Sequence, residues 1–335
     1  MKQKSFLMLA GATGLSILAA GATLFSSGNA PAFAEAGERL FPELEQKASE
    51  VAKLELRDGA FEMTIELRDG TFVDAASGYP VDLEPLKKLV SGMTLAEIAE
   101  AKTSDPARHA DLELAAAGAE TGSGSEVVLF DDGGDQIAHV IAGQRDFTLG
   151  GVTGGQYVRR GGEDASWLVH ARLDPPSNRA GWFETRLMDV DSSEISSVSL
   201  TTSEGQVISM TGTDGSLSID PLLMDGRAPA ENNLSRIVRL IETLDFTNVR
   251  ASQGSEDGGA SIQTTLADDT TVTLTALTAS ESDSEAQWFR INAIGGTDIS
   301  EALAGKVDGF EFSMSSADAE IFGWTLDDLT EQTPS

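Results

Sequence analysis

Apolar and polar residues alternate in three short stretches that follow Val51, and Asp-Gly pairs separate these stretches. The apolar positions are Leu54 and Leu56, then Phe61, Met63 and Ile65, then Phe72 and Val73. Alternation puts every second side chain on one face of a sheet, and an Asp-Gly pair favours a tight hairpin turn because glycine adopts a positive φ without steric cost. The pattern therefore predicts a three-stranded antiparallel meander.

The spacing of apolar residues becomes helical after Tyr79-Pro80, where the proline ends the extended pairing. Asp82 is a favourable helix N-cap, and the apolar residues after it share one helical face: Leu83, Leu86, Leu89, Val90 and Met93. We therefore expect one helix that packs on the meander. For residues 103–124 the sequence predicts a loop with a short irregular helix. Alternation of apolar and polar residues then predicts the strands of further hairpins at 127–130, 137–141, 156–160 and 167–171.

The opening of the meander is repeated later in the chain. Residues 49–56 read Ser-Glu-Val-Ala-Lys-Leu-Glu-Leu, and residues 193–200 read Ser-Glu-Ile-Ser-Ser-Val-Ser-Leu without a gap. Strand candidates, a proline-acid segment at 229–231 and a helical apolar stripe follow in the same order. The stripe consists of Leu234, Ile237, Val238, Ile241 and Leu244. This order predicts an α+β fold of two tandem duplicated modules, each an antiparallel β-meander plus one packed helix plus further β-hairpins.

We place the two modules at 35–188 and 189–335, after a separate N-terminal segment, 1–34. A chain of 335 residues is long enough for two domains with a core each. At the end of the first module, residues 182–188 predict a short helix. Near the C-terminus, residues 310–314 predict a strand and residues 324–329 another short helix.

The N-terminal segment has the pattern of an export signal. Lys2 and Lys4 precede an apolar run over 6–25, and Ala32-Phe33-Ala34 has the small residues that a signal peptidase accepts. The pattern predicts cleavage between Ala34 and Glu35. The alternative is a retained membrane anchor, because about 20 apolar residues can span a bilayer. In both cases we expect the body of the protein in the periplasm, with membrane contact only through this segment when it is uncleaved.

The composition excludes several classes of function. The chain has 54 acidic and 23 basic residues and a net charge of -31, so its field repels phosphate backbones and anionic lipids, and we expect no nucleic-acid partner. It has no cysteine, which excludes disulfides, Cys-ligated zinc, a thiol nucleophile and a lipidated cysteine. The core must be mainly aliphatic, because the chain has only four tryptophans and two tyrosines.

Two acidic segments invite comparison with calcium loops. Residues 131–135, Asp-Asp-Gly-Gly-Asp, offer three carboxylates for a hard cation, but the pattern favours a solvated hairpin turn. Residues 189–193 start like a calcium loop, but Glu194 replaces the required glycine and Leu200 the closing carboxylate. The three histidines, His109, His139 and His170, have no metal-ligand spacing. We therefore assign no catalytic residue, no cofactor and no metal site.

Trp182 and Phe183 are candidate partner-contact aromatics, because adjacent large rings on a surface are typical anchors for a partner or a glycan. The alternative is core packing, since both residues lie in the predicted helix 182–188, next to a sheet. The position beside a sheet favours core packing, and a partner contact is the alternative.

Several short segments of the chain resemble a known family when they are taken in order. They are Leu40-Phe41-Pro42, the strand after Val51, Tyr79-Pro80-Val81-Asp82 before a Leu-rich helix, Gly155-Gln156-Tyr157-Val158-Arg159 and Ser166-Trp167-Leu168. Their order is similar to that of the bacterial domain of unknown function DUF4340, over most of 40–250. The resemblance implies an exported or membrane-anchored protein, often encoded beside gliding-type ABC transport systems and their auxiliary subunits. It implies no established activity and no catalytic residues.

We therefore expect a non-catalytic accessory or scaffold component of an ABC-type membrane transport complex, with transporter or auxiliary envelope subunits as partners. One alternative is an extracytoplasmic binding module for an envelope glycan, peptide or cation, which a ligand-induced rise in melting temperature would identify. Another is a hydrolase with an unrecognised carboxylate site, which requires a cleft with convergent acids of perturbed pKa. The expectation is that the protein is not an enzyme.

Overall fold

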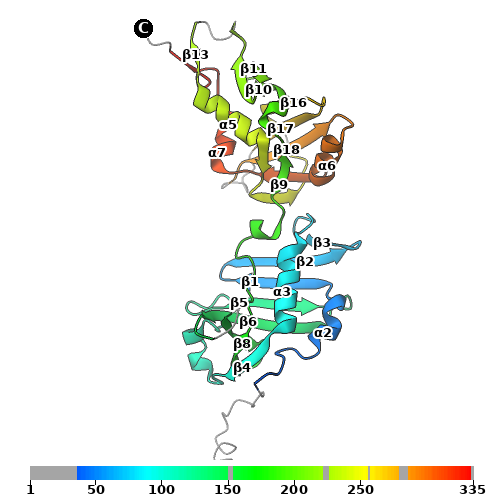
Figure 1. Ribbon diagram of the computed structural model, residues 1–335, viewed down its shortest axis with the longest axis vertical. Helices are drawn as coiled ribbons and strands as arrows, with labels where there is room; N and C mark the ends of the chain where they lie inside the picture. Colours follow the sequence, from blue (N-terminus) through cyan, green and yellow to red (C-terminus); the bar gives the residue numbers. More distant parts are fainter. Residues whose placement is uncertain (1–35, 150–153, 222–225, 256, 279–285, 333–335) are drawn as a thin grey trace, which may run out of the picture. The chain divides into compact units, whose positions relative to one another are not determined.

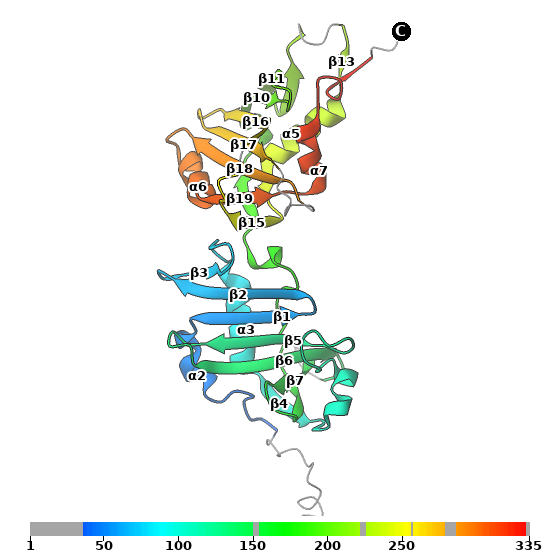
Figure 2. The ribbon, with the colours of Figure 1, turned by 180° about the vertical axis from the view of Figure 1, so that it is seen from behind.

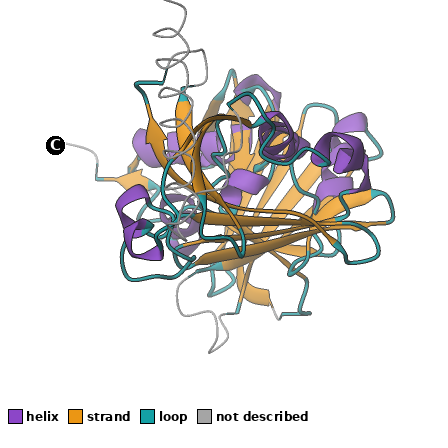
Figure 3. Ribbon diagram, turned by 90° about the horizontal axis from the view of Figure 1, so that it is seen from below, coloured by secondary structure: helices purple, strands orange, loops and turns teal. Residues whose placement is uncertain are grey.

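The computed structural model describes residues 36–149, 154–221, 226–255, 257–278 and 286–332. It has an α+β fold with mostly antiparallel sheets and few helices (Figures 1 and 3). The chain divides into two compact units: Met1–Leu67 with Leu83–Ser177, and Arg68–Asp82 with Asn178–Ser335. Ala34 and Glu35, the candidate cleavage site, lie outside the described residues. Within the described part of the chain, no helix combines the length and the hydrophobicity needed to cross a bilayer.

The first eight-stranded sheet has the order β3-β2-β1-β5-β6-β7-β8-β4. Its strands are β1 Lys53–Asp58, β2 Phe61–Arg68, β3 Thr71–Asp74, β4 Glu97–Ala101, β5 Ser125–Phe130, β6 Gln136–Asp146, β7 Gly155–Arg160 and β8 Ser166–His170. The meander predicted after Val51 is present as β1, β2 and β3. Leu54, Leu56, Met63 and Ile65 are buried, as the alternation requires.

Helix α3, Leu83–Leu95, covers one face of this sheet: it crosses in front of the strands in Figure 1 and behind them in Figure 2. It buries Leu86, Leu89 and Met93, whereas Leu83 is exposed, in contrast to the prediction. The remaining helical pieces are short: α2 Leu44–Lys47, η1 Ala48–Glu50, η2 Pro106–Arg108 and η3 Ala110–Leu112. The last two confirm the irregular helix predicted within 103–124.

Strand β4 was not predicted, because its sequence, Glu-Ile-Ala-Glu-Ala, follows directly on α3 and resembles more helix. It pairs with β8 at the edge of the sheet. The chain before α2 covers its outer side, since Gly37 N donates to Ile98 O at 2.9 Å and Ile98 N to Glu38 O at 2.8 Å. These bonds satisfy backbone groups that an open edge would expose.

The second eight-stranded sheet has the order β12-β11-β10-β16-β17-β18-β19-β15. Its strands are β10 Ile195–Thr201, β11 Val207–Thr213, β12 Ser216–Ile219, β15 Asn248–Ala251, β16 Asp257–Leu266, β17 Thr271–Leu277, β18 Trp288–Ile294 and β19 Phe310–Ser313. Two further pairs join β9 Arg186–Asp189 to β14 Thr243–Asp245, and β13 Ala228–Pro229 to β20 Thr330–Glu331. When the eight strands of each sheet are numbered by their order in the chain, both sheets have the same spatial order, 3-2-1-5-6-7-8-4.

The helices of the second unit are α5 Glu231–Glu242, α6 Asp298–Val307 and α7 Ser316–Ala319, with the 3-10 turns η4 Ala180–Trp182, η5 Ser192–Glu194 and η6 Glu320–Gly323. Helix α5 buries the predicted stripe from Leu234 to Ile241. Helix α6 was not predicted. A capping box fixes its start, because Thr297 and Ser300 exchange hydrogen bonds, and the serine replaces the Glu or Gln that usually marks this motif.

Two predicted helices were wrong. The segment 182–188 instead contains the end of the turn η4 and most of β9, because β9 finds a strand partner in β14. The segment 324–329 follows the helical pieces α7 and η6 instead of forming a helix. Ser315 accepts a hydrogen bond from Asp318 N and so starts α7 earlier in the chain.

Candidate functional site

A buried carboxylate lies at one end of the second sheet. Glu311 comes from β19, and its side chain is 0% exposed. The antiparallel register places it directly beside Arg250 of β15. A buried charge is costly unless it is paired and hydrogen-bonded, so the surroundings of Glu311 must supply a counter-ion and donors.

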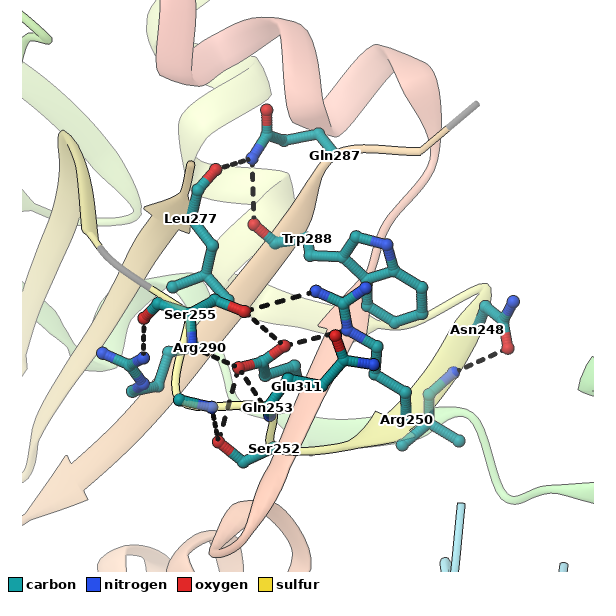
Figure 4. Close-up of polar contacts among 12 residues, drawn as sticks. Asn248, Arg250, Ser252, Gln253, Ser255, Leu277, Gln287, Trp288, Arg290 and Glu311 are labelled. Carbon is teal, nitrogen blue, oxygen red and sulfur yellow. Dashed lines mark hydrogen bonds and ion pairs between the residues drawn. The ribbon is translucent and has the colours of Figure 1, made fainter. Parts of the chain in front are cut away.

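Both carboxylate oxygens of Glu311 accept several hydrogen bonds (Figure 4). Oε2 accepts from Arg250 Nε at 2.8 Å and from Ser255 Oγ at 3.1 Å. Oε1 accepts from Gln253 N at 3.2 Å, Ser252 Oγ at 3.3 Å and Ser255 N at 3.4 Å. The segment 252–255 thus folds over the carboxylate and presents both backbone and hydroxyl donors to it.

Two arginines and one tryptophan complete this cluster. The guanidinium of Arg250 lies 4.1 Å from the ring centre of Trp288, an attractive cation–π distance. Arg290, on the neighbouring β18, donates to Ser255 O and to Asp257 Oδ1, both at 2.6 Å. Arg290 therefore holds the covering segment from the other side.

The charge state of Glu311 follows from these contacts. Burial by itself raises the pKa of its carboxyl, but the hydrogen bonds from Arg250, Gln253 and Ser255 outweigh burial, and the pKa lies below its ordinary value of 4.5. Glu311 is therefore an anion at neutral pH. An anion whose lone pairs are already engaged has no proton to give as a general acid and little capacity to take one.

The outer face of the sheet beside this cluster carries mainly hydroxyl groups. Val207 of β11 is an exposed apolar residue on this face. The exposed and half-exposed hydroxyl and amide side chains are Ser197, Ser199 and Thr201 of β10, Ser209, Thr211 and Thr213 of β11, Ser216 and Ser218 of β12, Ser261, Gln263 and Thr265 of β16, and Thr271, Thr273 and Thr275 of β17. The first sheet instead carries ion pairs on its strands, for example Lys53 with Glu55 at 2.9 Å and Arg57 with Glu62 at 3.5 Å. None of the hydroxyl and amide side chains named on this face is an acid.

A groove of about 780 Å³ adjoins the cluster at Ser252 and Arg290. One wall is the stretch 290–293 of β18, and the other walls come from the end of α6 and the stretch 308–310. This volume is within the range typical of ligand sites. In the described part of the chain, no group of three or more His, Asp or Glu residues is arranged to hold a metal ion.

Trp182 and Phe183, the candidate partner-contact aromatics, are buried within the second unit, with 0% and 6% of each residue exposed. Phe183 packs beside Tyr79, with ring centres 5.6 Å apart. Their side chains are part of the packed interior, and this burial does not favour contact with a partner. The partner contact stays a prediction.

The acidic segments fold as local turns. In 131–135, Asp131 Oδ1 accepts from Asp135 N at 2.8 Å, and Asp131 N donates to Asp135 O at 3.0 Å. The carboxylate of Asp191 accepts from the backbone and hydroxyl of Ser193 at 2.9 and 2.6 Å. These bonds engage the carboxylates of Asp131 and Asp191, two of the acids that a calcium loop would turn inward.

The histidines are not neighbours. His139 Nε2 lies 2.7 Å from Glu126 Oε1, and His109 Nε2 lies 2.9 Å from the backbone oxygen of Asp164. His170 is on β8, separated from β6, which carries His139, by β7. His139 and His170 therefore do not lie on adjacent strands, in agreement with the absence of a metal-ligand spacing between them.

The sequence reasoning missed the cluster around Glu311. Its only local signal is an acid between two phenylalanines, in Phe310-Glu311-Phe312-Ser313. Alternation would place such an acid on a solvated face, yet Glu311 and Phe312 are both fully buried. The donors come from 56 to 61 residues earlier in the chain, a contact that no local pattern reveals.

Fold and site together define an α+β protein with two large, mostly antiparallel sheets and a buried, internally paired carboxylate. The sequence model of the family described as Domain of unknown function (DUF4340) matches residues 72–314, most of the chain. The protein belongs to this family, in agreement with the resemblance of its motifs. Comparisons with curated proteins and with solved structures give no match.

Proposed function

We propose that the protein is a non-catalytic accessory or scaffold component of an ABC-type membrane transport complex in the cell envelope. The observation that carries the proposal is the hydrogen bonding of Glu311, whose two carboxylate oxygens accept bonds from Arg250 and from segment 252–255. Catalytic acids and bases need an accessible, poised carboxylate or histidine, and Glu311 is neither. The family resemblance supports the link to transport systems, and the sequence of residues 1–34 supports export.

We further propose that the chain arose by duplication of one α+β module, with copies at 35–188 and 189–335. The matching octapeptides at 49 and 193 support this proposal. The identical strand succession of the two sheets supports it independently, because that succession includes the same crossover to the last edge strand. A duplicated scaffold offers two related surfaces, a property that suits a component that holds other subunits together.

Affinity purification from detergent-solubilised membranes tests the assembly role. We expect a tagged, full-length chain to recover integral subunits of an ABC-type transporter or their auxiliary proteins. An untagged strain and an unrelated tagged periplasmic protein are the controls. Recovery of free monomer alone under gentle conditions, with crosslinking in intact cells equally negative, would contradict the proposal.

A second candidate function is an extracytoplasmic binding module for an envelope peptide, glycan or cation. The groove beside Arg290 favours this candidate, because its walls combine charged, amide and aromatic groups from Arg290, Asn292, Asp308 and Phe310. A ligand that binds only the folded state raises the melting temperature. A thermal shift screen of envelope peptides and glycans therefore separates this function from a purely structural role.

A further inference from the structure

Strand β18 is paired unequally on its two sides. It pairs with β17 over six positions, from Thr271 opposite Ile294 to Ala276 opposite Phe289. It pairs with β19 only at Trp288 and Phe289. Among the described residues, the stretch 290–294 therefore has a strand neighbour on one side only.

The unpaired side of this stretch opens into the groove of about 780 Å³. The groove exists because β19 begins only at Phe310, and the turn at Asp308 and Gly309 leads away to α6. Ser252 N donates to Gly309 O at 2.8 Å and fixes this turn. The course of the chain from α6 to β19 therefore leaves the edge of β18 along 290–294 without a neighbouring strand in the part of the chain that the structure describes.

In an antiparallel sheet, alternate residues point their backbone N–H and C=O groups toward each neighbour. Unpaired groups of this kind form a template for an added strand, and peptides bind many proteins by such strand addition. We propose that the groove binds an extended peptide of a partner protein, which pairs with β18 along 290–294. This site deepens the proposed function and rests on it, because it supplies a contact through which a scaffold holds a partner.

The walls of the groove define the chemistry of the peptide. The groove is lined by one cation, Arg290, whose guanidinium is engaged by Asp257 and Ser255, and by one anion, Asp308, which is exposed at the rim. Since the chain as a whole carries a net charge of -31, a basic side chain is favoured beside Asp308. Among the residues that line the groove, Ala293 and Phe310 are half-buried, so apolar side chains are favoured beside them. The stretch of five residues matches a peptide of about 17 Å. The structure thus points to a short extended segment that alternates apolar and polar residues and carries lysine or arginine.

Gly305 of α6 offers a selective way to block the site. It lines the groove, and a Cβ built on it meets nothing within 4 Å, so Gly305→Leu adds an apolar side chain at the groove wall and its Cβ fits the fold. Leucine also has a higher helix propensity than glycine. Gly323→Leu is the matched control, since a Cβ there also meets nothing within 4 Å and Gly323 lines a different depression.

The experiment measures binding of the acetylated, amidated peptide Lys-Val-Thr-Val-Thr-Lys to the full chain, by calorimetry and by hydrogen exchange with mass spectrometry. A version with proline at the third position, which removes a backbone donor, tests strand pairing. We expect binding to wild type and to Gly323→Leu, protection of amides in 290–294, and at least about tenfold weaker binding for Gly305→Leu and for the proline peptide.

Three results would overturn the site: no binding at millimolar peptide, equal binding to Gly305→Leu, or protection confined to another edge such as β12. The consequences for the proposed function are read separately. If Gly305→Leu still recovers transporter subunits from membranes while the peptide fails to bind, the scaffold role stands and the groove is not its contact. If peptide binding is confirmed and no subunits are recovered, the groove stands and the transporter assignment fails.

Discussion

Arg250 Nε donates to Glu311 Oε2 at 2.8 Å across the β15–β19 pair. The arginine side chain is 15% exposed and the carboxylate 0%, so the pair is largely removed from water. Such a pair contributes little net free energy to folding, because the cost of desolvating the two charges offsets much of their Coulomb attraction. What it does fix is geometry: the carboxylate orients the segment 252–255 and with it the rim of the groove at Ser252.

Loss of the charge on Glu311 should destabilise the second unit. We expect Glu311→Gln to lower the free energy of unfolding by about 3 kcal/mol, because Arg250 keeps its charge while its buried counter-ion is gone. The measurement is urea unfolding followed by circular dichroism. Glu204→Gln, in an exposed turn, is the matched control and should change stability by less than about 0.5 kcal/mol. A loss for Glu311→Gln no larger than that of the control would contradict the structural role.

The same pair predicts a pH dependence of stability. The pKa of Glu311 is lowered in the folded state, so its stabilisation is complete above the unfolded pKa of about 4.5 and is lost as pH falls through the folded pKa. The difference in unfolding free energy between wild type and Glu311→Gln should therefore be constant near neutral pH and shrink in acid. Subtracting the two curves removes the other carboxylates. A difference that stays constant down to pH about 3 would show that Glu311 titrates normally.

Tyr79 is the centre of an aromatic cluster in the second unit. It meets Phe183, Phe246, Phe310 and Phe312 edge-on, with ring centres 4.9 to 5.7 Å away. Burial, helped by the charge of Glu184, raises the pKa of the Tyr79 phenol to about 12. The stabilisation from keeping it neutral is thus complete below pH 10 and is lost as pH rises toward 12.

Tyrosine ionisation can be observed directly, because the chain has only two tyrosines. In Tyr157→Phe, Tyr79 is the remaining phenol, and its ultraviolet absorbance should titrate with a midpoint near 12. The urea-unfolded protein, in which the phenol is solvated, should titrate near 10 and serves as the internal control. A midpoint near 10 in the folded variant would mean that Tyr79 is not enclosed by the cluster.

Alternation predicted the strands that have one buried and one solvated face. Strands β1 to β3 and β10 to β12 belong to this class, and so does the stripe of α5, because each buries a regular subset of its residues. In such elements the spacing of apolar residues along the sequence predicts whether a strand or a helix forms. The turn residues predicted where the strands end, because Asp69 and Asp214 adopt the positive φ that tight hairpin turns require.

The rest depended on contacts between distant residues. Segment 252–255 covers the second face of β19, and so it buries Glu311, which alternation would have placed in water. Strand β9 forms because β14, far along the chain, pairs with it, although residues 182–188 have a helical pattern. Tertiary partners overrode local propensity in both cases. The groove beside β18 is likewise a product of where β19 begins, which no periodicity specifies.

Gly161 and His139 provide a test of close packing in the first sheet. Gly161 N donates to His139 O at 2.9 Å, and a Cβ on Gly161 would lie 1.8 Å from the imidazole Nδ1. In Gly161→Ala the ring must move and lose its 2.7 Å contact with Glu126, so we expect a loss of about 2 kcal/mol in urea unfolding. In a His139→Ala background the space is free and the penalty should largely vanish, a coupling that a double-mutant cycle measures. Gly323→Ala, with open space around its Cβ, should cost nothing. An equal penalty for Gly161→Ala in both backgrounds would mean that the backbone, and not the imidazole, requires glycine there.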